Sequence, residues 1–328
     1  MTISTYFYFI CFSLPYVVNT MYFYYFNKIN VGNALKIVEY LKKSLRRVIL
    51  DLDWMDSNTK AIALKKLNKM QIAIEDYGKA KIENYYKNLK INPGMYFRNV
   101  LQIYKKTRNK YYRRLLNKKD WMEDITKSAS YLHTENRIFV PVTIPQWPFF
   151  KSSSPMYHNF GSLGWIVGSE IINGFDTTGR NFDDDGNVSL WWSEDTENLF
   201  NAHKQCIINQ YRNQSKHLDK NVSDALTTET HIKYSLGIKL AYSAYYNWLK
   251  THEVKPLINS RYSPRQQFWI SAATIFCPAT QSFKYLGTDS YHFNKYTRVI
   301  GPFRDLEEFS AAFNCPKGSK MNPVKKCQ

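Results

Sequence analysis

Apolar residues recur every three or four positions along much of the first 120 residues, which predicts long helices. The clearest helix starts at Asp56 or Ser57, either of which can cap its first turn. Its predicted apolar face consists of Ala61, Leu64, Leu67, Met70 and Ile74. A break at Pro93 and Gly94 precedes another helical stretch, from about 95 to 117.

The pattern changes at residues 136–150, "NRIFVPVTIPQWPFF", where β-branched residues and prolines replace helix formers. This composition predicts a short edge strand and then a proline-rich loop, because edge strands tolerate proline. A helix is expected from about 161 to 174, followed by a turn at "DDDGN". Helical spacing returns in "LWWSEDTENLFNAHKQCIINQY" and again downstream, where one face is marked by Leu236, Leu240, Ala244 and Trp248.

The chain has 328 residues, 44% of them hydrophobic, which suits one large domain or two small ones. The sequence contains no run of 18 apolar residues, so no membrane span is predicted. Residues 1–18 are apolar without a basic flank, so they read either as a weak signal peptide or as a buried helix. The net charge of +18 permits anionic partners. No nucleic-acid-binding motif accompanies it, so we expect solvated helix faces and no nucleic-acid partner.

Five cysteines are present and none forms a C-x-x-C pair, which excludes a cysteine-type zinc site. Three N-x-S/T sequons, at Asn187, Asn213 and Asn221, are candidate glycosylation sites. Sequons and scattered cysteines together favour an extracellular or secretory-pathway setting.

The segment "GWIVGSEIINGFDTTGRNFDDDGN", residues 164–187, has the build of a metal-binding helix. In an H-E-x-x-H helix, positions i and i+4 share a face, so two imidazoles meet one zinc and the glutamate takes a proton from the zinc-bound water. Here Glu170 stands at the glutamate position, with Asp176 downstream. Ser169 and Asn173 stand where the histidines should be.

Several long segments, in order, resemble the neprilysin and endothelin-converting-enzyme family of zinc metallopeptidases. They are "LDWMDSNTK", "NRIFVPVTIPQWPFF", "GFDTTGRNFDDDGNVSLWW", "QCIINQY", "LAYSAYYNWL", "RVIGPFRDLEEFSAAFNC" and "MNPVKKC". The resemblance covers nearly the whole of this chain, whereas the proteins of the family are about twice as long. It implies a predominantly helical α+β fold, with residues 1–95 as part of a helical lid lobe and residues 96–328 as a thermolysin-like, catalytic-type lobe.

The resemblance places the family's two zinc-binding histidines on Ser169 and Asn173, and the third ligand, a glutamate, on Thr230. The carboxylate that orients one histidine falls on Tyr234. A shift of one residue would place Glu229 at the third position, but the downstream match has no gap. Neutral oxygens are poor zinc ligands, so we expect no bound cofactor although the family uses zinc.

A substitute cation site made of Glu170, Glu229 and His231 is disfavoured. Residues 229 and 231 of one helix point about 200° apart.

The resemblance also marks residues that are retained. Glu170 matches the general base and Asp176 a carboxylate that holds a histidine, while His292 matches the transition-state stabiliser. Arg298 matches the clamp on the substrate carbonyl, and Ser128 and Ala129 match the substrate-binding edge, with its Asn changed. Simpler interpretations remain: Glu170 pairs with a base such as Arg298, and His292 only lines the cavity.

The family pairs the cysteine of "QCIINQY" with the one near the C-terminus, which implies a Cys206–Cys327 disulfide. The family partners of Cys11, Cys277 and Cys315 lie in the N-terminal half that has no counterpart here, so these three are expected to be free thiols.

The leading hypothesis is a catalytically inactive, neprilysin-like protein that binds a peptide or a protein, with any membrane anchor in a preceding region. One alternative is an active zinc endopeptidase that cuts short peptides on the amino side of apolar residues. The other is a truncated, non-functional gene product.

Overall fold

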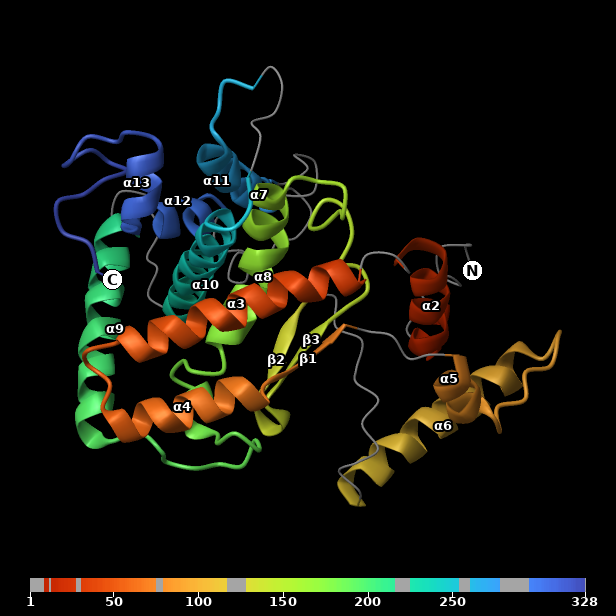
Figure 1. The fold of residues 1–328 in the computed structure, drawn as a ribbon. Coiled ribbons are helices and arrows are strands. Elements are labelled where there is room, and N and C mark those ends of the chain that lie inside the picture. The colour runs from red at the N-terminus through yellow and green to blue at the C-terminus, as the bar shows by residue number, and fades with distance from the viewer. Residues whose placement is uncertain are drawn as a thin grey trace. The chain divides into compact units, whose positions relative to one another are not determined.

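The structure is a computed structural model that describes residues 9–11, 13–27, 31–74, 79–116, 128–215, 225–253, 260–277 and 295–327. It is predominantly helical with one small sheet, so the expected fold class is confirmed (Figure 1). Among the described helices, none has both the length and the apolar composition that crossing a membrane requires.

The chain divides into two compact units. The smaller comprises residues 1–29, 74–128 and 141–143, and the larger comprises residues 30–73, 129–140 and 144–328. Residues 30–73 therefore belong to the larger unit, although the resemblance assigns them to the lid lobe. The lobe boundary at residue 95 remains a prediction.

The described part of the smaller unit is helical. Its elements are α2 (Pro15–Tyr22), η1 (Phe23–Asn27), α5 (Lys79–Tyr86) and α6 (Tyr96–Leu116). Helix α2 packs on α5, with the buried Tyr16 against Ile82, Tyr85 and Tyr86. Helix α6 confirms the helix expected from about 95 to 117.

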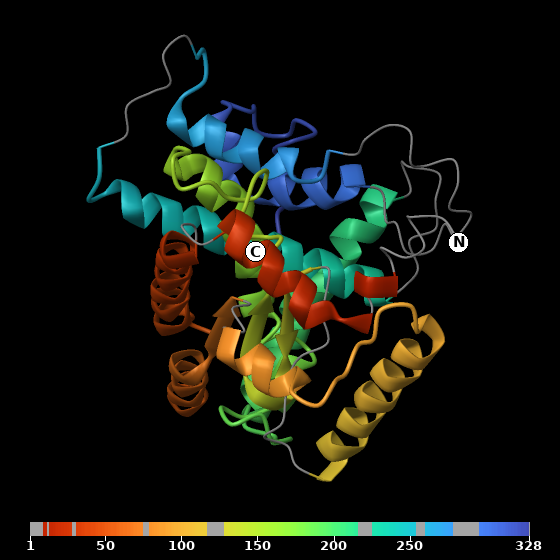
Figure 2. The same ribbon diagram turned by 90° about the vertical axis from the view of Figure 1, so that its right-hand side faces the viewer.

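The larger unit is built around α10, which packs on α8, α3 and α12 (Figures 1 and 2). Its helices are α3 (Val31–Asp51), α4 (Ser57–Lys69), α7 (Met156–Asn159), α8 (Trp165–Ile172), α9 (Glu194–Ser215), α10 (Ala225–Leu249), α11 (Pro264–Thr274), α12 (Lys295–Asp305) and α13 (Glu307–Ala312). Shorter helical turns are η2 (His133–Glu135), η3 (Phe160–Gly164) and η4 (Gly179–Asn181). Rings such as Trp165, Tyr245 and Trp269 fill the core, in agreement with the aromatic-rich sequence.

A three-stranded sheet lies in this unit except for Ile74, the last residue of β1. Strand β3 (Arg137–Val140) lies between β1 (Gln71–Ile74) and β2 (Ser130–Leu132). Strands β2 and β3 are antiparallel, with Tyr131 opposite Ile138. The prediction that the strand near residue 138 lies at an edge is therefore wrong: β3 is central, and its only nearby proline, Pro141, follows its last residue.

Helix α4 begins as predicted but ends early. The Asp56 carboxylate accepts the backbone N–H groups of Asn58 and Thr59, which caps the first turn. The helix stops at Lys69, and residues 71–74 form β1 instead, because Ile72 and Ile74 suit a strand that pairs with β3.

The buried face of α4 also differs from the prediction, since it carries Thr59, Ala63, Lys66 and Leu67 while Ala61 is exposed. Lys66 is fully buried, and its Nζ donates to the carbonyl oxygens of Gly179 and Phe182, both at 2.7 Å. Burial lowers the pKa of Lys66 to about 8, although the negative charges of Asp176, Asp183 and Asp184 act to raise it. This lysine ties α4 to the loop that follows α8.

Candidate functional site

Helices α8 and α10, which pack against each other, carry the residues that the resemblance aligns with the metal ligands. Ser169 and Glu170 lie on α8, Asn173 caps its C-terminal end, and Thr230 lies on α10, which packs against α8. The helices approach closely because glycines meet at their crossing: a Cβ on Gly168 would stand 2.9 Å from the carbonyl oxygen of Gly237.

Glu170 has no free carboxylate oxygen. Its Oε1 accepts a hydrogen bond from Nζ of Lys233 at 2.8 Å. Its Oε2 accepts from Nδ2 of Asn173 at 2.8 Å and from the backbone N–H of Tyr131 at 3.1 Å. The residue is 7% exposed, and its burial raises the pKa of the carboxyl above its ordinary value, while the charge of Lys233 and the three hydrogen bonds act against that rise.

The expectation that Glu170 pairs with a basic side chain is confirmed, but that side chain is Lys233 and not Arg298. The guanidinium of Arg298, on α12, lies instead over the ring of Tyr234, 5.4 Å from its centroid. Tyr234 also packs edge-on against Trp165 and Phe276. Tyr234, which the resemblance aligns with a carboxylate, thus belongs to an aromatic cluster.

The residues present do not suit zinc. The Ser169 hydroxyl donates to the carbonyl oxygen of Trp165, one turn back in its own helix, at 2.9 Å. The Asn173 amide is directed at Glu170, and Glu229 accepts from Nζ of Lys204 at 2.9 Å. Zinc takes imidazole, thiolate or carboxylate, and no group of three or more such side chains in the described part of the chain could hold a metal ion.

Asp176 keeps a local structural role. Its Oδ1 accepts the backbone N–H groups of Thr178 and Gly179 at 3.0 and 2.8 Å, which starts the turn at η4. Burial raises the pKa of this carboxyl, although those hydrogen bonds oppose the rise.

His231, next to Thr230, is 1% exposed. Burial, and then the positive charge of Arg298, lowers its pKa to about 4. The imidazole is therefore neutral near pH 7.

The remaining predicted site residues are scattered or not described. Ala129 is buried directly before the edge strand β2, and Ser128 is exposed. His292 and Asn221 lie outside the described residues. Asn187 is an exposed residue in the turn after Asp183, whereas Asn213 lies in α9.

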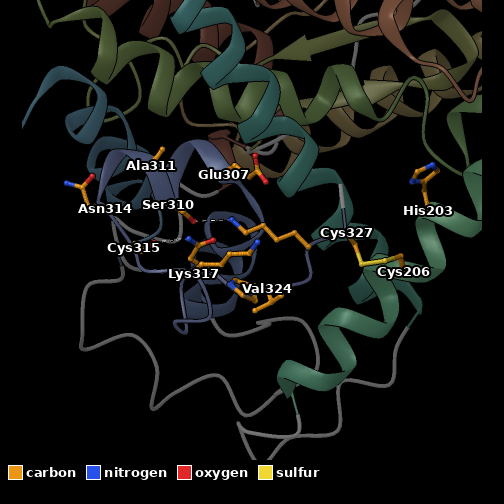
Figure 3. A pocket seen from close by; sticks show the side chains of 13 residues that line it. His203, Cys206, Glu307, Ser310, Ala311, Asn314, Cys315, Lys317, Val324 and Cys327 are labelled. Atoms are coloured by element: carbon orange, nitrogen blue, oxygen red, sulfur yellow. Dashed lines mark hydrogen bonds between the residues drawn. A yellow bond between two sulfur atoms is a disulfide. The ribbon is translucent and has the colours of Figure 1, made fainter.

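Cys206 and Cys327 form a disulfide, as the resemblance implies. Cys11, Cys277 and Cys315, which all lie in described residues, are free. The disulfide and Cys315 line a pocket of about 940 Å³, with Glu307 and Lys317 among its other lining residues (Figure 3). None of the degenerate metal positions lines this pocket.

The sequence pattern does not identify Lys233 as the partner of Glu170. A signal was available, because Lys233 follows Thr230 by three residues and so shares its face of a helix. Only the packing of α10 on α8 shows that this face meets Glu170.

Comparisons with known proteins give the family. The peptidase family M13 model matches residues 128–328, and the N-terminal model of the same family matches residues 11–77. This chain therefore belongs to peptidase family M13.

Two curated relatives illustrate the match. Neprilysin-2 of Drosophila melanogaster is 34% identical over 319 residues, which are 93% of this chain and 41% of the relative. Neprilysin-1 of Caenorhabditis elegans is 35% identical over 332 residues, 96% of this chain and 44% of the relative. The chain thus spans less than half the length of these relatives.

Solved structures agree in fold. The zinc metalloprotease ZMP1 of Mycobacterium tuberculosis, in complex with an inhibitor, superposes with a TM-score of 0.79 at 25% identity, over 97% of this chain and 50% of that one. The Haemonchus galactose-containing glycoprotein complex gives a TM-score of 0.78 at 24% identity, over 97% and 55%. The second likeness concerns the fold alone.

Proposed function

We propose that this chain is a catalytically inactive, neprilysin-like protein that binds peptides outside the cell or in the secretory lumen. The observation that carries the proposal is the state of Glu170, whose two carboxylate oxygens are both engaged. A general base must reach the water whose proton it takes. A base held by an ammonium, an amide and a backbone N–H does not meet that condition.

The donor set supports the same conclusion. In a zinc peptidase, the metal lowers the pKa of a bound water to about 7 and polarises the scissile carbonyl. Ser169, Asn173 and Thr230 offer no imidazole or carboxylate for that metal. No other described group replaces them.

Peptide binding is supported by features that do not require a metal. Strand β2 is at an edge of the sheet, and an extended peptide can add to such an edge through main-chain hydrogen bonds. Ala129 and Ser128 directly precede this strand. Arg298 offers a guanidinium as a donor for a peptide carbonyl, and one face of this group lies over the ring of Tyr234.

The proposed location, outside the cell or in the secretory lumen, is supported by features that suit an oxidising compartment. The Cys206–Cys327 disulfide is typical of secreted and lumenal proteins. Asn187, one of the three sequon residues, is exposed and accessible to a glycan.

Binding and cleavage are separable by experiment. Fluorescent peptides with apolar residues are incubated with the purified chain and excess zinc, then followed by anisotropy and mass spectrometry. We expect saturable binding and no cleavage above the buffer rate. Arg298→Ala should weaken binding by about tenfold or more, since hydrogen bonds to charged groups contribute roughly 1.5–3 kcal/mol. Arg304→Ala, on the same helix, is the matched control.

The alternatives predict other results. Cleavage that a chelator abolishes would identify an active zinc endopeptidase. A folded chain that binds no peptide of the series would contradict the proposed peptide binding.

A further inference from the structure

Lys233 joins the two helices that carry the degenerate metal positions. Its Nζ lies 2.8 Å from Oε1 of Glu170, so an ammonium from α10 meets a carboxylate from α8. The side chains of the pair are 22% and 9% exposed. In the family's zinc site the cation bridges the same two helices, because two ligand positions are on the first and one is on the second.

We propose that Lys233 is an internal cation that takes the electrostatic place of the metal in this chain. This inference rests on the proposed function, since it assumes that no zinc occupies the site. A buried carboxylate without a compensating charge is strongly unfavourable. The positions that would hold a metal now carry Ser, Asn and Thr, none of which supplies a positive charge. Lys233 does, one helical turn after Thr230.

An ordinary surface ion pair would not have this role. Exposed pairs stabilise little because water and salt screen them. Glu170 is instead enclosed, and its second oxygen is held by Asn173 and by the edge strand through Tyr131. The carboxylate is thus fixed in orientation, and Lys233 donates to its remaining oxygen.

A consequence follows for attempts to restore the metal site. Ser169→His, Asn173→His and Thr230→Glu together supply the family's ligands, but they leave the ammonium beside Glu170. Its charge repels a divalent cation, and its hydrogen bond occupies the base. Restoration therefore requires the removal of Lys233 as well.

The first test compares zinc binding by two restored variants, measured by calorimetry with circular dichroism as the check on folding. The triple variant should bind zinc at least about tenfold more weakly than the same variant with Lys233→Ala, a factor in the range found when groups supporting a metal site are changed. The triple variant with Lys239→Ala removes the same charge from the same helix and should behave like the triple variant. Equal affinity with and without Lys233, or no zinc binding by either variant, overturns the proposal.

The second test needs no metal. In the natural sequence, Lys233→Ala leaves Glu170 without its counter-charge and should lower the unfolding temperature by on the order of 5–10 °C. Glu170→Gln added to Lys233→Ala should recover most of that loss, because a neutral amide can keep the bonds to Tyr131 and Asn173. Lys239→Ala should change the unfolding temperature little. If the effects of Lys233→Ala and Glu170→Gln on the unfolding temperature only add, Lys233 is not the compensating cation. The same conclusion follows if Lys233→Ala lowers the unfolding temperature no more than Lys239→Ala does.

These outcomes are distinct from a failure of the proposed function. Stoichiometric zinc in the natural chain would refute catalytic inactivity. Equal zinc affinity of the triple variant with and without Lys233→Ala, with the natural chain free of zinc, would refute only the role of Lys233.

Discussion

Replacing both Cys206 and Cys327 with serine is expected to lower the free energy of unfolding by up to about 4.9 kcal/mol. The bridge spans a sequence separation of 121 residues and ties α9 to the C-terminal segment. In the chain-entropy model, a cross-link over so long a loop removes much of the freedom of the unfolded chain, and the figure is an upper value. Urea unfolding followed by circular dichroism measures the loss as a lower midpoint.

The matched control is Cys315→Ser. Cys315 is a free thiol on the wall of the same pocket (Figure 3), so its replacement should change the free energy of unfolding by less than about 1 kcal/mol. Equal midpoints for the double variant and the natural chain would contradict the bond or its contribution. An equal loss from Cys315→Ser would mean that sulfur packing, and not the cross-link, stabilises this region.

Gly237→Ala is expected to destabilise the chain by about 3 kcal/mol, through overpacking where α10 crosses α8. A Cβ at this position would lie 2.2 Å from Oγ of Ser169 and 2.8 Å from its Cα and N. The backbone atoms belong to a packed helix and cannot move away alone. The two helices would have to separate, which also stretches the contact between Lys233 and Glu170.

Gly164→Ala is the control for this substitution. Its Cβ would meet nothing closer than Cβ of Ala241 at 3.6 Å, which is ordinary contact, and its backbone is helical. Because alanine is a better helix former than glycine, we expect stability to be unchanged or higher by up to about 1 kcal/mol. Thermal unfolding of both variants decides the point. A Gly237→Ala variant as stable as Gly164→Ala would show that the crossing is looser than its geometry indicates.

The spacing of apolar residues predicts the helices well where no tertiary contact favours another structure. Helix α6 and the helical spacing of α9 and α10 follow from apolar periodicity alone. Residues 71–74 do not, because pairing with β3 outweighs the helical pattern that continues through Ile74. The burial of Lys66 was not predicted for a similar reason. A lysine is buried only where hydrogen-bond acceptors are available, and its acceptor, the Gly179 carbonyl, lies 113 residues away in the sequence.

In the candidate site, too, local sequence patterns predict some features, whereas others depend on contacts between distant residues. Motif spacing located Ser169, Glu170 and Asn173 on one helix, and the resemblance gave the Cys206–Cys327 bridge. Spacing could not give the partner of Glu170, because Lys233 is 63 residues away and reaches it only through helix packing. The substrate-side predictions for His292, Ser128 and Arg298 remain predictions.

Zinc content tests the central claim most directly. The purified natural chain is incubated with excess zinc, passed through a desalting column and analysed for metal by mass spectrometry, with protein measured in the same fractions. A site whose base is held by Lys233, Asn173 and Tyr131, and whose ligand positions are Ser, Asn and Thr, predicts far less than one zinc per chain. One zinc per chain that a chelator removes, together with peptide cleavage that disappears with it, would contradict the account.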